Sequence, residues 1–174
     1  MKRIRLSVLA VLLSAVLSGC IVNPYESGME ALEKGQYEEA AKQFRQAVEK
    51  EQNKADSYRG LGLALWETRD YEGAKEAFQA ALKEGSEKTG TVFNLLGSCE
   101  LKAGNVKEAI AYFEEGLKSE GISDELTKAM RFNCIYAYEK LGDMDTARSL
   151  LEEYTADYPE DEDAAKEAQF LETR

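Results

Sequence analysis

The feature that most constrains the fold is a pattern of small and aromatic residues that repeats about every 34 positions. Gly28, Tyr37, Ala40, Phe44 and Ala47 recur 34 residues later as Gly62, Tyr71, Ala74, Phe78 and Ala81. A shift of 35 then aligns Gly62, Ala74 and Phe78 with Gly97, Ala109 and Phe113, and a shift of 38 aligns Gly104, Ala109 and Phe113 with Gly142, Ala147 and Leu151. A period of this length indicates stacked units that cannot bury their apolar faces alone.

The composition of the repeated segment predicts helices. Pro24 and Pro159 are the only prolines, and the residues between them are rich in Ala, Leu, Glu, Lys and Gln. These are strong helix formers, and no proline lies between Pro24 and Pro159 to interrupt a helix. Each unit is therefore expected to be a helical hairpin.

This pattern resembles the tetratricopeptide repeat, on matching stretches at 28–47, 61–81, 96–113 and 133–154. The resemblance covers about residues 21–159 and implies an all-α, right-handed α-solenoid of about four helix-turn-helix units. The chain departs from the family pattern at three positions. Arg69 replaces a turn glycine, Gly116 replaces an alanine, and Ile135 stands where a small residue is expected.

The recurring residue types have physical roles. Glycine or alanine at a helix crossing lets two backbones approach, and the large side chains fill the space between units: Phe44, Phe78, Phe113 and Leu151. Asp70, Asn105 and Asp143 precede the second helices, where their side chains are expected to cap backbone amides. Residues 160–174 are expected to form a C-terminal capping helix, with Ala164, Ala168 and Leu171 on one stripe.

The N-terminus is interpreted as a targeting signal. Lys2, Arg3 and Arg5 precede the apolar segment 6–17, which is too short for a comfortable membrane span. The segment ends Leu17-Ser18-Gly19-Cys20 and resembles a bacterial lipobox. This resemblance implies a signal peptide at 1–19, lipid acylation of Cys20, including a palmitate-type chain, and a short tether at 20–24. The array would then occupy 25–159, and the alternative is an uncleaved signal anchor.

The location that follows is extracytoplasmic, with lipid on Cys20 anchoring the chain in a bilayer. Ile21 follows the cysteine where some inner-membrane retention signals have Asp, which favours an outer membrane if the cell has two. In a cell with one membrane, the anchor would lie in the outer face of the cytoplasmic membrane.

Charge and composition exclude several functions. The formal net charge of −11 repels nucleic acid, and the chain contains no His. We therefore expect no enzyme, metal or cofactor, although a carboxylate pair for hydrolysis stays an alternative among 33 acidic residues. The run 160–163 is interpreted as a helix start because it lacks the glycine and distant Glu of a calcium loop. Cys99 and Cys134 are expected to be buried core residues, with a disulfide between them as the less favoured alternative.

The remaining candidate site is the groove lined by the first helix of each unit, which the family resemblance implies to be concave. The outward stripe of these helices supplies the candidate partner-binding residues: Met29, Arg59, Leu63, Trp66, Asn94, Ser98, Lys102, Phe132 and Tyr136. Aromatic, aliphatic and polar side chains in this mixture suit a protein or peptide partner. Such a protein would be a scaffold or assembly factor in the cell envelope.

Two alternatives stay open for these residues. The first is that Leu32, Leu63, Leu101 and Phe132 belong to the core and contact no partner. The second is a glycan or small ligand, held by Trp66 and Tyr136 as stacking platforms.

Overall fold

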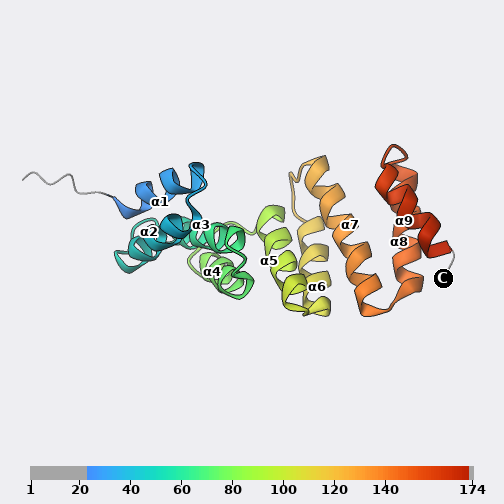
Figure 1. Cartoon of the computed structure of the whole chain (residues 1–174), viewed down its shortest axis with the longest axis horizontal. Helices are drawn as coiled ribbons and strands as arrows, with labels where there is room; N and C mark the ends of the chain where they lie inside the picture. Colours follow the sequence, from blue (N-terminus) through green and yellow to red (C-terminus); the bar gives the residue numbers. More distant parts are fainter. Residues whose placement is uncertain (1–22, 173–174) are drawn as a thin grey trace, which may run out of the picture.

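The computed structural model describes residues 23–172, and this part of the chain is helical with no strand. It contains nine helices: α1 (Pro24–Glu33), α2 (Tyr37–Glu49), α3 (Lys54–Glu67), α4 (Tyr71–Lys83), α5 (Gly90–Ala103), α6 (Val106–Leu117), α7 (Asp124–Leu141), α8 (Met144–Asp157) and α9 (Glu162–Glu172). The first eight form four antiparallel pairs stacked in chain order, with α1 and α9 at opposite ends of an elongated array (Figure 1). The α-solenoid expected from the sequence is confirmed.

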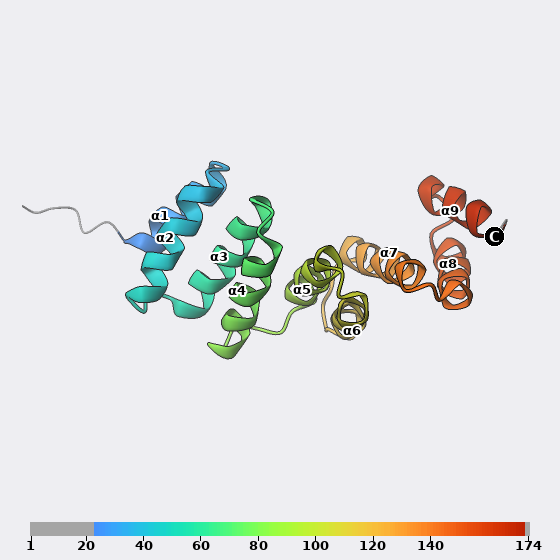
Figure 2. The ribbon, with the colours of Figure 1, turned by 60° about the horizontal axis from the view of Figure 1, so that its bottom comes forward.

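The direction of the helix axes changes along the stack. In Figure 1 helices α5 to α8 stand upright while α1 to α4 are strongly tilted, and after the rotation of Figure 2 the first four are seen side-on instead. Contacts join α1 to α3 and α5 to α7, the first helices of neighbouring pairs. We call the face formed by these first helices the inner face and the opposite one the outer face.

Glycine and phenylalanine pack against each other within the first three pairs. Phe44, Phe78 and Phe113 are fully buried. A Cβ atom added at Gly62 would lie 2.6 Å from the ring of Phe78, and one at Gly97 would lie 2.6 Å from that of Phe113. Only glycine permits such close approach of the two helices. In the fourth pair Ile135 and Leu151 occupy the corresponding places and are both buried.

The expected caps of the second helices are confirmed at two of three positions. The side chain of Asp70 accepts a hydrogen bond from the amide of Gly73, and that of Asp143 accepts one from the amide of Thr146. The prediction for Asn105 was wrong, because its side chain makes no capping bond. Its Nδ2 instead donates to a carboxylate oxygen of Glu100 at 2.7 Å, since Glu100 is buried and needs a partner.

The turns within the hairpins explain the departure at Arg69. Gly35, Gly104 and Gly142 have positive φ at the equivalent position, where the chain leaves one helix for the next. Arg69 has a φ of 64°, so it holds the same left-handed conformation with a side chain that disfavours it.

Helix α9 covers the C-terminal end of the stack. Ala164 and Leu171 are buried and Ala168 packs against the same core as Leu151, which confirms the expected apolar stripe. Asp161 precedes the helix, and its side chain accepts hydrogen bonds from the amides of Asp163 and Ala164. The acidic run 160–163 thus includes the start of a helix.

Candidate functional site

The predicted partner-binding residues lie on helices α1, α3, α5 and α7, and none is fully buried. Met29, Arg59, Lys102 and Tyr136 are exposed, and the others are half-buried: Leu63, Trp66, Asn94, Ser98 and Phe132. Those suspected of belonging to the core, Leu32, Leu63, Leu101 and Phe132, each pack against a core cluster while keeping part of their surface accessible. The inner face therefore offers a mixed polar and apolar surface.

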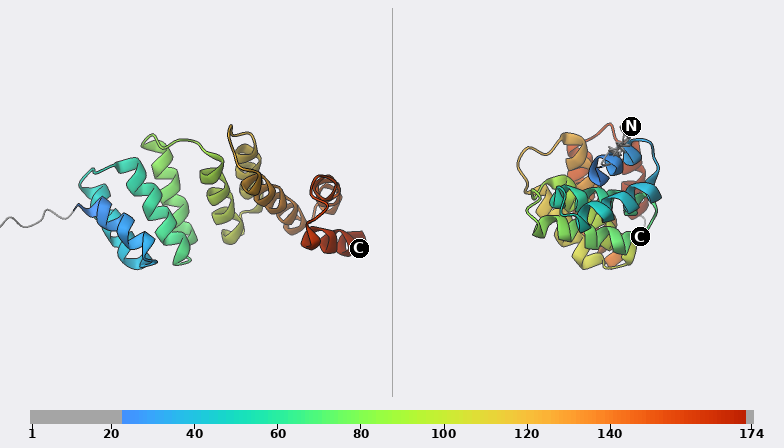
Figure 3. Two further views of the ribbon diagram at one scale, coloured as in Figure 1. Left: turned by 90° about the horizontal axis from the view of Figure 1, so that it is seen from above. Right: turned by 90° about the vertical axis from the view of Figure 1, so that its left-hand side faces the viewer.

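Two of these residues meet at a cavity of about 510 Å³ between the second and third pairs. Arg59 and Leu63 of α3 form one side, and α5 with the α6–α7 loop forms the other. The cavity exists because α3 and α5 approach each other less closely than α1 approaches α3 or α5 approaches α7. Figure 3 shows segment 84–89 running as an extended connection between α4 and α5 at this junction.

The lining of this cavity is mainly apolar and hydroxylic. Its members beyond α3 are Thr89, Gly90, Thr91, Val92, Leu95, Glu120, Gly121, Ile122, Ser123 and Leu126. The Arg59 guanidinium pairs with Asp56 on the same helix at 2.9 Å, and both side chains are about half exposed. Such a pair is weak in water and leaves Arg59 able to exchange partners.

Sequence reasoning missed the residues from the two loops. The available signal was the lengthening of the repeat from 34 to 35 residues, which reflects a longer connection between pairs. The further step to 38 residues comes from α7, which has 18 residues where α5 has 14. The α4–α5 and α6–α7 connections span 84–89 and 118–123, whereas the α2–α3 connection spans only 50–53. The two longer loops supply much of the cavity wall.

The other candidates are dispersed along the inner face. The Trp66 ring lies 4.9 Å from that of Tyr71, measured between centroids, and Asn94 accepts a hydrogen bond from Asn133 at 3.2 Å. The Lys140 ammonium lies 5.2 Å from the centre of the Tyr136 ring. The structure does not bring Trp66 and Tyr136 to one cavity, and their roles as contact residues stay predictions.

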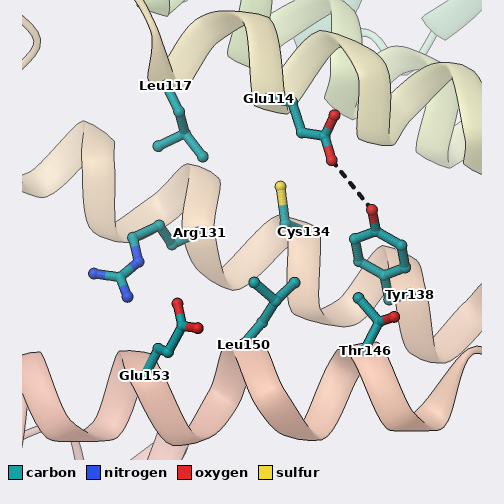
Figure 4. A pocket seen from close by; sticks show the side chains of 8 residues that line it. All are labelled: Glu114, Leu117, Arg131, Cys134, Tyr138, Thr146, Leu150 and Glu153. Carbon is teal, nitrogen blue, oxygen red and sulfur yellow. Dashed lines mark hydrogen bonds between the residues drawn. The ribbon is translucent and has the colours of Figure 1, made fainter.

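A second depression lies on the outer face and was not expected from the sequence. It has a volume of about 420 Å³, and α7 forms its floor between α6 and α8 (Figure 4). We call it the outer groove; its lining consists of Glu114, Leu117, Arg131, Cys134, Tyr138, Thr146, Leu150 and Glu153. Tyr138 donates a hydrogen bond to Glu114 at 3.1 Å, drawn as the dashed line in Figure 4.

The two internal cysteines are buried and free, as expected. Burial raises the pKa of the Cys134 thiol to about 12, and the nearby Glu114 carboxylate acts in the same direction. Burial likewise raises the pKa of Cys99 to about 12. Both thiols are therefore neutral at pH 7 and behave as small apolar groups.

Within residues 23–172, no group of three or more His, Cys, Asp or Glu side chains is arranged to hold a metal ion. None of the described helices is both long and apolar enough to cross a membrane. Cys20 and the predicted signal peptide lie outside the described residues.

Comparisons with known proteins agree on one family. A model described as tetratricopeptide repeat matches residues 25–89, 61–125 and 94–162. The structure resembles that of YrrB, described as a TPR protein with an unusual peptide-binding site, with a TM-score of 0.72, 24% identity, and coverage of 85% of this chain and 74% of that one. It also resembles MamA 41-end from Desulfovibrio magneticus RS-1, with a TM-score of 0.73, 18% identity, and coverage of 87% and 82%. At these identities the likeness shows the fold, and no curated protein matches the sequence.

Proposed function

The chain belongs to the tetratricopeptide repeat family, and we propose that it is a lipid-anchored scaffold that binds a peptide segment of a protein in the cell envelope. The observation that carries the proposal is the cavity between α3 and α5. It lies on the face formed by the first helices, and it combines an exposed cation with several aliphatic side chains.

The chemistry of this cavity favours one kind of peptide. Leu63, Leu95 and Ile122 offer an apolar surface for an aliphatic anchor. Arg59 stands at the edge, where it can exchange Asp56 for a carboxylate of the partner. Helical α-solenoids use such grooves because a stack of helices presents an extended surface to an extended segment.

The proposed anchor rests on the sequence from Leu17 to Cys20. Two or more acyl chains, each contributing about 0.8 kcal/mol per buried methylene, hold a protein at a bilayer without help from its surface charge. This suits a chain whose formal net charge of −11 would be repelled by anionic lipid headgroups.

Binding in the cavity can be tested with a phage-displayed library of random peptides, selected on the purified protein. For the peptides recovered, Arg59→Ala should weaken binding by about 1 to 3 kcal/mol in a fluorescence anisotropy titration. Lys107→Ala is the matched control, because Lys107 of α6 is an exposed cation that neither lines the cavity nor belongs to the candidate partner-binding residues. Equal losses for both variants would refute the cavity as the binding site.

The anchor is tested separately by Cys20→Ser. This exchange removes the thiol that would carry the lipid, so the protein should leave the detergent-extracted membrane fraction or accumulate as an unprocessed precursor. A variant that is processed and membrane-bound like the wild type would show that the lipobox interpretation is wrong.

A further inference from the structure

The outer groove combines an apolar floor with acidic walls. Leu117, Cys134 and Leu150 supply the apolar part, from α6, α7 and α8 respectively. Glu114 of α6 and Glu153 of α8 extend from the two opposite walls (Figure 4). A surface of this kind matches a side chain that is aliphatic along its length and charged at its end.

The charges of the groove are unbalanced. Arg131 is the one cation among the lining residues, and its Nη1 donates to the Asp157 carboxylate at 2.7 Å. Glu114 accepts only a neutral hydrogen bond, from the hydroxyl of Tyr138. Glu153 is exposed and makes no ion pair or hydrogen bond within the described part of the chain. With Asp157 included, three carboxylates face one guanidinium, so the groove is electrostatically complementary to a cation.

The outer face differs at the preceding junction. Between α4 and α6, Gln79 donates a hydrogen bond to the Tyr112 hydroxyl at 3.3 Å, and Lys75 lies 3.8 Å from the buried carboxylate of Glu100. The chain thus supplies its own cation and its own bridge there. At the α6–α8 junction, within the described part of the chain, no hydrogen bond joins the two helices directly, and the one cation of the groove, Arg131, is already paired with Asp157.

We propose that the outer groove binds a lysine or arginine side chain of a partner protein, independently of the inner cavity. The aliphatic part of that side chain packs against Leu117, Cys134 and Leu150, while Glu153 and Glu114 attract its charged end. A second copy of this chain is a poor occupant, because two bodies of net charge −11 repel each other.

The test uses two fluorescein-labelled amphipathic peptides of leucine, alanine and lysine, identical except that glutamine replaces lysine in the second. The lysine peptide should bind the wild-type protein at least about fivefold more tightly in an anisotropy titration, and higher salt should reduce the difference. The variant Glu114→Gln with Glu153→Gln should lose most of this preference. The amide oxygen introduced at position 114 can still accept a hydrogen bond from the Tyr138 hydroxyl, so the fold is not disturbed.

A matched control separates the groove from the general acidity of the chain. Glu115→Gln with Glu152→Gln removes the same charge from exposed neighbouring positions that do not line the groove, and it should keep the preference. Glu153→Lys should shift the preference toward a peptide in which glutamate replaces lysine.

Methyl resonances locate the bound peptide. Leu117 and Leu150 should shift on addition of the lysine peptide, whereas Leu63 and Leu95 of the inner cavity should not. Equal binding of the lysine and glutamine peptides, equal losses in the two double variants, or shifts confined to Leu63 and Leu95 would overturn the proposal. The first two results would not bear on peptide binding by the inner cavity, which Arg59→Ala tests, whereas the third would place the lysine peptide in that cavity.

Discussion

The first three helix pairs and the fourth fill the space between their two helices with different side chains. In α3–α4 and α5–α6 a glycine faces a phenylalanine sixteen residues later, as Gly62 faces Phe78. At the same spacing in α7–α8, Ile135 and Leu151 are both buried. The comparison shows that the combined volume of the two facing residues is constrained more strongly than the identity of either residue.

The fourth pair also carries contacts between cations and aromatic rings, which the earlier pairs of the described chain lack. The Lys128 ammonium lies 4.3 Å from the centre of the Tyr158 ring, and the Arg131 guanidinium lies 5.5 Å from the same ring. The Tyr154 hydroxyl donates to Asp161 at 2.8 Å. These contacts hold the α8–α9 connection against α7, at the end of the stack where no further pair follows. Interior pairs are buried from both sides, whereas the terminal pair needs a cap and local bonds.

The largest effect is expected from removing a phenylalanine of the interior. Phe78→Ala should destabilise the protein by about 3 to 5 kcal/mol, because removing the fully buried ring leaves a cavity between α3 and α4. Urea unfolding followed by circular dichroism measures the loss. Glu72→Ala is the control: the Glu72 carboxylate is exposed and pairs only with Lys75, so its removal should change stability by less than about 0.5 kcal/mol. Similar losses would mean that the buried face of α4 is misassigned.

An added methyl group tests the complementarity of size directly. Gly97→Ala should cost about 1 to 3 kcal/mol, because its Cβ would meet the Phe113 ring at 2.6 Å. Combining it with Phe113→Leu, which approaches the combination of the fourth pair, should cost less than the sum of the two single exchanges. Strict additivity in urea unfolding would contradict the comparison between the pairs.

Acid should loosen the C-terminal end through Asp161. Hydrogen bonds from the Ala164 amide and the Tyr154 hydroxyl lower the pKa of this carboxyl below its usual 3.8. Its contribution to stability is therefore present above pH 3.8 and is lost as the pH falls through the lowered folded-state pKa. Hydrogen exchange of α9, measured at pH 5 and pH 3, should show a difference between wild type and Asp161→Asn that shrinks at pH 3. A constant difference would exclude this titration as the cause.

The smallest effect concerns the turns, where the second pair differs from the other three. Arg69→Gly should stabilise the protein by roughly 0.5 to 1 kcal/mol, because it relieves the backbone strain of a left-handed conformation at position 69. This gain is partly offset because glycine makes the unfolded chain more flexible. Gly104→Ala should act in the opposite direction, since its φ is 86°. Thermal unfolding of both variants measures the two shifts. Shifts of the same sign would remove turn conformation as the explanation.

The repeated residues were sufficient to predict the helical pairs, the buried side chains and the two working caps. These properties depend on local spacing, since residues sixteen positions apart in a hairpin meet in every pair that has the same turn. The free state of Cys99 and Cys134 followed in the same way, from their places on apolar helix faces. Asn105 shows the limit of this reasoning, because the buried carboxylate of Glu100 competed for its side chain.

The two depressions were decided by tertiary structure. The inner cavity depends on the angle between the second and third pairs, which separates α3 from α5 and brings the α6–α7 loop beside Arg59. The outer groove depends on side chains of three helices, such as Glu114 and Tyr138, which are 24 residues apart. The period of a repeat specifies how each hairpin closes, but small rotations between hairpins accumulate from all their contacts. Those rotations determine which exposed side chains face a common space.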